Sequence, residues 1–136
     1  MKKAKQVIVM RNDFNMRKGK MVAQGSHASL GVILGMMGPL PGGPSHAKQI
    51  KCLRLSPHTP IAEWINGTFT KICVRVESEE ELFEIEDKAI EAGLPVKLIT
   101  DSGLTEFDGQ STNTCLAIGP AWSDEIDAIT GHLKLL

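Results

Sequence analysis

The sequence has no tyrosine, and aromatic residues make up only 4% of its 136 residues. Proteins that hold single-stranded bases by stacking need several exposed rings, so this composition argues against a stacking platform for nucleic acids. With few rings to bury, a core must be built from Val, Ile, Leu, Met and Ala. Hydrophobic residues make up 42% of the chain, and a chain of this length can bury a core without metal or disulfide support.

Cysteine is also scarce, with Cys52, Cys73 and Cys115 as the three present. Their number is odd and they show no C-x-x-C spacing, which argues against a disulfide framework or a zinc site and favours a reducing compartment. We expect Cys73 and Cys115, which lie in apolar runs, to be buried. No pair of histidines has the spacing of metal ligands, so we predict no bound metal.

Long hydrophobic runs are missing as well. No stretch approaches the ~18 apolar residues that a membrane span requires. The apolar run after the basic start MKKAK is too short for the core of a signal peptide. We therefore expect a cytoplasmic protein that does not associate with membranes.

The chain has no large excess of either charge, since its net charge is −1. The charges are nevertheless separated along the sequence. Residues 1–20 hold seven Lys or Arg against one acid, and residues 77–91 hold eight acids against one Lys. A local basic patch of this kind can contact phosphates, whereas we interpret the acidic segment as a solvated helix face.

Strands and helices are predicted to alternate along the chain. Four apolar segments rich in β-branched residues predict strands at 5–10, 68–76, 95–100 and 113–120. Helical periodicity and capping residues predict helices at 20–37, 59–67, 78–93 and 123–131. Ser78 and Ser123 are the expected N-caps of the last two helices. Residues 38–58, which begin GPLPGGP, are expected to form a long loop with a short helix.

This alternation predicts an α/β fold, a single three-layer domain over residues 1–136 with a four-stranded mixed β-sheet and helices on both faces. Only a loop joins the last two strands, so we expect that pair to be antiparallel or separated in the sheet. In helix 20–37, small and apolar residues recur on one side, which we expect to pack on the sheet. They are Val22, Ala23, Ser26, Leu30, Ile33, Leu34 and Met37. The expected buried face of helix 78–93 is Leu82, Ile85, Ala89 and Ile90.

The stretch RKGKMVAQGSHASLG, residues 17–31, places polar side chains in one line. Since each helical residue advances ~100°, Lys20, Gln24 and His27 fall within an arc of about 60° that also includes Gly31. A cation, an amide and an imidazole in one line suit a binding or catalytic face. Asp101 directly follows a strand, at the kind of strand end where α/β proteins bind ligands. Two interpretations fit it: a general base or lysine partner, and an aspartate that caps a turn.

Four segments together resemble the type-2 peptidyl-tRNA hydrolases, in the right order and over almost the whole chain. They are RKGKMVAQGSHASLG, GLPVKLITDSGLTEF, TNTCLAIGP and EIDAITGHLKLL. The resemblance implies an α/β fold with a four-stranded mixed sheet, in a homodimer. It also implies that peptidyl-tRNA is the substrate, that the ester between the peptide and the 3′ ribose of tRNA is hydrolysed, and that no metal or organic cofactor takes part.

The motifs of that family can be placed on individual residues. The Lys-x-Lys-x-x-x-Gln-x-x-His motif falls on Lys18, Lys20, Gln24 and His27, the Asp-x-Gly-x-Thr loop on Asp101, Gly103 and Thr105, and the threonines before the last strand on Thr112 and Thr114. The chain departs from the family at Gly25, where a small thiol is usual, and at Glu106, where Gln is frequent. Its segment 38–58 is also longer than a minimal member needs.

Residue chemistry and resemblance together suggest roles. Asp101 would orient or deprotonate the attacking water, with His27 as its partner. Lys20 would stabilise the developing negative charge or hold Asp101 in place. Gln24 and Thr105 would position the ester or the water. The residues expected to contact tRNA are Arg17, Lys18, Thr112 and Thr114.

Two other functions stay open at the level of the sequence. One is a non-catalytic tRNA- or ribosome-binding module, which would need the cations but not the acid at Asp101. The other is a deacylase of free aminoacyl-tRNA, because the helical stripe would serve any acyl transfer to water.

Overall fold

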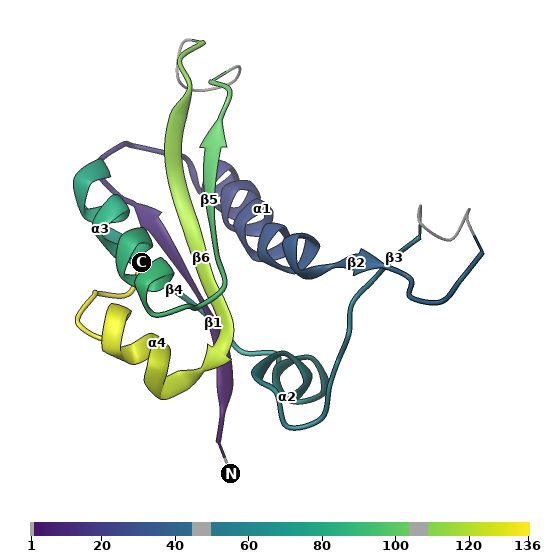
Figure 1. The fold of residues 1–136 in the computed structure, drawn as a ribbon. Helices are drawn as coiled ribbons and strands as arrows, with labels where there is room; N and C mark the ends of the chain where they lie inside the picture. The colour runs from purple at the N-terminus through teal and green to yellow at the C-terminus, as the bar shows by residue number, and fades with distance from the viewer. Residues whose placement is uncertain (1, 45–49, 104–108) are drawn as a thin grey trace.

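A four-stranded mixed sheet forms the centre of the computed structural model, which describes residues 2–44, 50–103 and 109–136 (Figure 1). Its strands are Ala4–Arg11 (β1), Lys71–Val76 (β4), Val96–Asp101 (β5) and Thr112–Trp122 (β6). They lie in the order β4-β1-β6-β5. The β1–β4 pair is parallel, and the β1–β6 and β5–β6 pairs are antiparallel. The predictions of a four-stranded mixed sheet and of an antiparallel last pair are confirmed.

Helices lie on both faces of this sheet (Figure 1). They span Lys18–Met36 (α1), Pro60–Asn66 (α2), Glu79–Glu91 (α3) and Ser123–Thr130 (α4). The helices α3 and α4 cover one face, and α1 covers the other face over β6 and β5. Among the described residues, no helix has both the length and the apolar character of a membrane-spanning segment.

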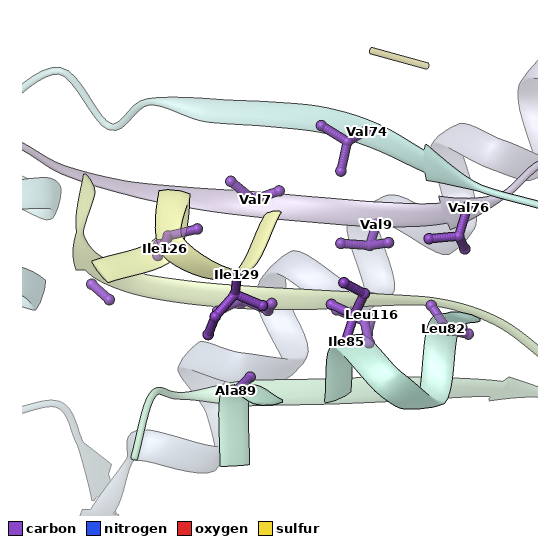
Figure 2. Packing of buried hydrophobic residues seen from close by; sticks show 12 residues of the cluster. Val7, Val9, Val74, Val76, Leu82, Ile85, Ala89, Leu116, Ile126 and Ile129 are labelled. Carbon is purple, nitrogen blue, oxygen red and sulfur yellow. The ribbon is translucent and has the colours of Figure 1, made fainter. Parts of the chain in front are cut away.

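The core is divided in two by the sheet. Successive strand residues point to opposite faces, so Val7 and Val9 of β1 point toward α3 and α4, where they join Leu82 (Figure 2). Ile8 and Met10 point to the other face and pack with residues of α1. The alternation of residues along β1 therefore determines which side chains meet each helical layer.

The side of α1 that packs on the sheet is not the predicted one. The buried residues of α1 are Gln24, Gly25, Ala28 and Val32. Val22 and Leu30, which were expected to be buried, are 69% and 58% exposed. Close packing explains the difference, because a Cβ at Gly25 would lie 3.7 Å from side-chain atoms of Ile8 and Met10. Small residues let the helix approach the sheet, and the predicted apolar side faces outward.

Helix α3 agrees with the prediction at its start and departs from it near its end. The Ser78 hydroxyl accepts a hydrogen bond from the Glu81 N–H at 3.1 Å, so the predicted N-cap is confirmed. Leu82, Ile85 and Ala89 are buried, but Ile90 is 59% exposed. Ile90 is turned by about 100° from Ala89 around the helix, which directs it away from the core.

Two further predictions are wrong. Cys73 is exposed, because it lies beside Ile8 on the α1 side of the sheet, but on β4, and α1 covers β6 and β5 instead; Cys115 is buried as expected. Ser123 does not cap α4, since the N-cap residue is Trp122. The Ser123 N–H instead donates to the Lys3 carbonyl at 2.8 Å, which ties the start of α4 to the N-terminal segment.

The segment after α1 contains structure that the sequence did not predict. Gly38–Pro39 (β2) pairs antiparallel with Lys51–Cys52 (β3). This short ribbon projects from the C-terminal end of α1, away from the sheet (Figure 1).

The two outer strands of the sheet differ in how their free edges are covered. Along β4, the Arg75 N–H donates to the Lys134 carbonyl at 3.0 Å, and the Leu136 N–H donates to the Cys73 carbonyl at 3.1 Å. Within the described part of the chain, β5 has β6 as its only strand neighbour. The outer edge of β5 therefore presents backbone groups that no strand pairs with.

Candidate active site

The carboxylate of Asp101 is the centre of a polar cluster between α1 and the end of β5. Its Oδ2 accepts hydrogen bonds from Lys20 Nζ at 2.5 Å and from Gln24 Nε2 at 3.0 Å. The side chains of Asp101 and Lys20 are only 9% and 14% exposed. Lys20 and Gln24 lie about one turn apart on α1, so both reach the same carboxylate. The structure thus brings together the helical stripe and the acid that ends the strand. We call these three residues the Asp101 cluster.

The side chain of Gln24 is held in one orientation. Thr114 Oγ1 donates to Gln24 Oε1 at 2.5 Å, which leaves Nε2 to face the carboxylate. Gln24 is 3% exposed and Thr114 is fully buried. A buried amide left without partners would cost roughly 1–3 kcal/mol, so these bonds also make the burial of Gln24 possible. Thr114 therefore positions Gln24, and Gln24 positions Asp101.

A β-bulge places Thr114 on the correct side of the sheet. The pairing of β5 with β6 shifts by one residue between Ile99 and Thr100, and Thr114 is skipped. Neighbouring residues of a regular strand point to opposite faces, yet Thr114 and Cys115 both bond to Gln24. The extra residue of a bulge re-aims side chains in this way. Sequence periodicity gave no signal of it.

The second oxygen of Asp101 closes a turn. Its Oδ1 accepts a hydrogen bond from the Gly103 N–H at 2.6 Å. Gly103 has φ +81°, and a Cβ there would lie 2.1 Å from the Gln110 carbonyl oxygen, so glycine is required. Both interpretations of Asp101, the lysine partner and the turn-capping aspartate, are realised on the same carboxylate. Thr105 lies outside the described residues.

The surroundings of Asp101 favour its ionised form. The hydrogen bond from Lys20 is the main cause that holds the pKa of Asp101 below its ordinary value of 3.8. The Gly103 N–H and the positive charges of Lys20 and His27 lower the pKa further, and burial raises it by less. A carboxylate with a lowered pKa is a weak proton acceptor at neutral pH. It is better suited to hold a cation or to orient a water molecule.

His27, Arg17 and Lys18 lie around the more open parts of the cluster. His27 is exposed and lines a hollow with Thr100, next to Asp101 in the sequence. Arg17 is the N-cap residue of α1 and Lys18 its first residue, and both are exposed. The positive end of the helix adds to these charges. The N-terminal end of α1 is therefore a basic surface beside the Asp101 cluster.

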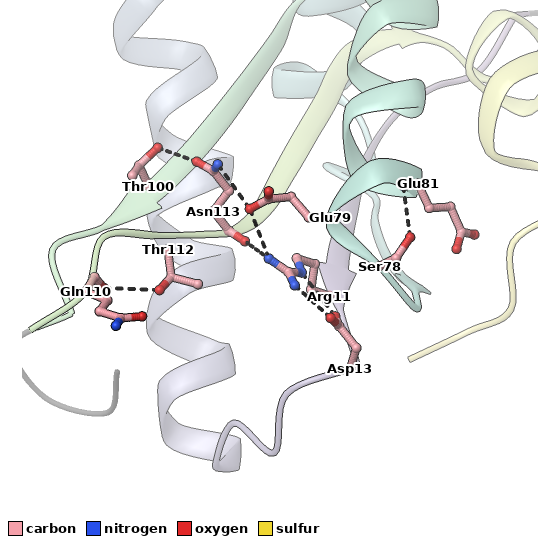
Figure 3. A network of polar contacts seen from close by, with 9 residues as sticks. All are labelled: Arg11, Asp13, Ser78, Glu79, Glu81, Thr100, Gln110, Thr112 and Asn113. Atoms are coloured by element: carbon pink, nitrogen blue, oxygen red, sulfur yellow. Dashed lines mark hydrogen bonds and ion pairs between the residues drawn. The ribbon is translucent and has the colours of Figure 1, made fainter. Parts of the chain in front are cut away.

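Sequence reasoning missed Arg11, which it counted only among the basic residues. Its guanidinium is 9% exposed and pairs with Asp13 at 2.7 Å and with Glu79 at 3.3 Å (Figure 3). It also donates to the Asn113 carbonyl at 3.1 Å. The Asn113 side chain accepts a hydrogen bond from Thr100 Oγ1 at 2.7 Å. Arg11 thus ties the loop before α1 to the strand ends that carry the cluster. The spacing of an arginine and an acid after a buried strand was the available signal.

A metal centre is not evident in this part of the molecule. Within residues 2–44, 50–103 and 109–136, no three His, Cys, Asp or Glu side chains are placed to share a metal ion. The chemistry available to the cluster is that of an ammonium, an amide, an imidazole and a carboxylate.

Known proteins are similar to this chain in sequence or in fold. Residues 4–136 match the family model described as Peptidyl-tRNA hydrolase PTH2. The chain is 43% identical to the peptidyl-tRNA hydrolase of Methanocaldococcus jannaschii over 132 residues, which are 97% of this chain and 99% of that protein. It is 39% identical to the peptidyl-tRNA hydrolase of Methanopyrus kandleri, with 97% of each chain covered. In fold alone, it is similar to a solved structure of a protein of unknown function from Agrobacterium tumefaciens, with a TM-score of 0.56 and 13% identity over 100% of this chain and 99% of that chain.

The lowered pKa of Asp101 predicts a pH-dependent contribution to stability. The ionised carboxylate stabilises the fold above its ordinary pKa of 3.8, and this contribution is lost as the pH falls through the lowered value. We expect Asp101→Asn to reduce the free energy of unfolding near neutral pH, and the difference from the wild type to close as the pH falls from 3.8 through the lowered pKa. Denaturant titrations over this range measure the difference.

Asp127→Asn is the matched control, because Asp127 forms an ion pair with Lys5 whose acid is 55% exposed. It should change stability little at any pH. A deficit of Asp101→Asn that stays constant from neutral to acid pH would contradict the assignment.

Proposed function

The chain belongs to the PTH2 family of peptidyl-tRNA hydrolases, and we propose that the Asp101 cluster is where it hydrolyses the ester between peptide and tRNA. The observation that carries this proposal is the convergence of Lys20 and Gln24 on one oxygen of Asp101, beside an exposed His27. We further propose that residues 1–136 act as one catalytic unit.

The reaction needs an activated water, a stabilised oxyanion and a protonated leaving group. The water adds to the ester carbonyl carbon, and the tetrahedral intermediate then releases the 3′ hydroxyl of tRNA, which takes up a proton. The lowered pKa of Asp101 makes it an orienting group for the water more than a base. We assign the proton transfer to His27, because an imidazole is the commonest general base in enzymes.

Lys20 and Gln24 have separate parts in this scheme. The Lys20 ammonium stabilises negative charge as it develops on the oxyanion, in a setting where both it and Asp101 are largely withdrawn from water. One N–H of Gln24 Nε2 donates to Asp101, and its Oε1 accepts from Thr114. The second N–H of Nε2 is therefore the group that can position the ester or the water. Thr105 is proposed as a second positioning group on the family motif alone.

The basic surface at the start of α1 is the proposed contact for tRNA. Arg17 and Lys18 would bind phosphates of the acceptor end, whose helical RNA is read through its shape and backbone. Thr112 is half-buried at the start of β6 and is proposed to contact the same substrate. For Thr114 we propose a different part, the positioning of Gln24, because its side chain is fully buried.

Replacement of the central carboxylate tests the assignment. Asp101→Asn should lower kcat for peptidyl-tRNA by about 10²–10⁴-fold, the range typical for the loss of a group in acid–base or water-activating machinery. Single-turnover hydrolysis of N-acetyl-aminoacyl-tRNA measures it. Asp127→Asn, which removes a surface carboxylate, should keep full activity. Hydrolysis by Asp101→Asn close to the wild-type rate would mean that another group serves the water.

Replacement of Lys18 tests the tRNA contact. Lys18→Ala should weaken binding of tRNAs of different sequence about equally, and it should reduce the slope of log affinity against log salt by about 1. Filter binding at several salt concentrations measures both quantities. Lys88→Ala, which removes an exposed cation from α3, is the control. An unchanged salt slope for Lys18→Ala would place the RNA elsewhere.

We also propose a homodimer that works in the cytoplasm. An apolar groove of about 440 Å³ lies beside α1, with Val22 and Leu30 exposed on its helical wall and Leu136 beside it. Exposed apolar surface of this kind is typical of an interface. Sedimentation equilibrium should show a dimer that Leu30→Glu converts to monomer, and a monomeric wild type would exclude it. Cell fractionation tests the compartment.

A further inference from the structure

Two adjoining hollows lie between α1 and the free edge of β5. The first, of about 480 Å³, reaches from His27 and Thr100 to Gly31 and Lys97. The second, of about 460 Å³, begins at the same Gly31 and Lys97 and continues to Gly35 at the far end of the helix. The hollows adjoin at Gly31 and Lys97, where the Lys97 side chain lies against the helix, and we call them together the α1–β5 trough. It starts beside the Asp101 cluster and runs toward the C-terminal end of α1.

Two glycines of α1, Gly31 and Gly35, line this trough. A Cβ at Gly35 would meet no atom within 4 Å, and a Cβ at Gly31 would meet the side chain of Lys97 at 3.0 Å. The fold requires neither glycine by its backbone conformation, since neither has a positive φ. Glycine within a helix is less favourable than alanine by about 1 kcal/mol. At Gly35 the missing side chain leaves open space, whereas at Gly31 it leaves room for the side chain of Lys97.

The opposite wall of the trough is an unpaired strand edge. In the described residues, β5 pairs with β6 alone, so its outer N–H and C=O groups are available to an extended chain. Strand addition to such an edge recognises a peptide through its backbone, whatever its side chains. An edge of this length, at about 3.4 Å per residue, fits roughly four or five residues of extended peptide. Recognition of this kind suits a substrate whose peptide varies in sequence.

The charges of the two ends of α1 assign the trough to the peptide and not to the RNA. RNA binding depends on several cations that neutralise phosphates. Arg17 and Lys18 lie at the N-terminal end of the helix, whereas Lys97 is the only Lys or Arg among the described residues that line the trough. Apolar side chains such as Leu34 and Val96 make up much of the rest. The ester at the Asp101 cluster would thus have RNA on one side and peptide on the other.

We propose that the α1–β5 trough binds the peptide part of peptidyl-tRNA as an extended strand added to the edge of β5. This proposal rests on the Asp101 cluster being the catalytic site. It goes beyond that assignment, because it names where the substrate chain lies before the ester is cut.

The test compares substrates that differ only in peptide length, from N-acetyl-aminoacyl-tRNA to a six-residue peptide on the same tRNA. Gly31→Leu and Gly35→Leu each place a side chain in one part of the trough, and leucine favours the helix over glycine. Gly31→Leu also requires the flexible Lys97 side chain to move, so a denaturant titration of each variant accompanies the kinetics. Each should raise KM by about tenfold for peptides long enough to reach the added side chain, with a smaller effect on kcat. One helical turn rises ~6 Å over four residues, which equals about two residues of extended peptide. The rise in KM caused by Gly35→Leu should therefore begin with peptides about two residues longer than those first affected by Gly31→Leu.

Asp87→Leu is the matched control, because it adds a leucine to an exposed position of α3 on the other face of the sheet. It should leave KM unchanged for every peptide length. Substrates with one N-methylated peptide amide probe the backbone recognition directly. Methylation at every second position along the peptide should raise KM, while methylation at the positions between should not.

The possible results separate the explanations. Equal penalties on N-acetyl-aminoacyl-tRNA and on long peptides would place RNA in the trough and overturn the proposal, as would KM values that the two glycine variants leave unchanged. Indifference to N-methylation at all positions would overturn strand addition. Failure of the catalytic assignment looks different, since it appears as activity retained by Asp101→Asn and leaves the length dependence of KM unaffected.

Discussion

The hydrogen-bonded ion pair between Lys20 and Asp101 is the contact on which the arrangement of this site depends. It joins a helix that follows the first strand to the last residue of a strand some eighty positions later. Both partners are largely withdrawn from solvent, and loss of one partner from such a pair leaves an uncompensated charge. Gln24 shares the same carboxylate oxygen and is itself held by Thr114. The same contacts therefore determine the position of α1 on the sheet and the geometry of the Asp101 cluster.

In α1, side-chain size and hydrogen bonding decide which residues are buried as much as polarity does. Gln24 is buried because hydrogen bonds satisfy its side chain, and Gly25 and Ala28 are buried because they are small enough for close contact with β1 and β6. Larger apolar residues such as Leu30 are left outside. Because Gln24 and small residues occupy the buried side, α1 buries less apolar surface than it could. In return, the amide of Gln24 is held in a fixed position at the site. The choice of buried residues on α1 thus follows from the position of Gln24 in the Asp101 cluster.

Much of the fold follows from the sequence, and so does the outline of the cluster. The β-branched runs locate the four strands, and the spacing of Lys20, Gln24 and His27 with an acid after a strand indicates their convergence. Hydropathy could not orient α1, because it records the polarity of side chains and not how closely a backbone can approach. Hydropathy also could not predict the bulge at Thr114 or the ion pairs of Arg11, since both arise from contacts between segments distant in the sequence.

The bulge in β6 has a consequence for how this segment can evolve. Side chains alternate between the two faces of a strand. The removal or insertion of one residue between Thr112 and Cys115 would therefore move the side chains of β6 on one side of that point to the opposite face of the sheet. Residues there whose side chains do not bond to Gln24 can be replaced by others of similar size. The number of residues cannot change, because any frame other than the present one turns the hydroxyl of Thr114 away from α1. We therefore expect this part of β6 to tolerate substitutions but not insertions or deletions.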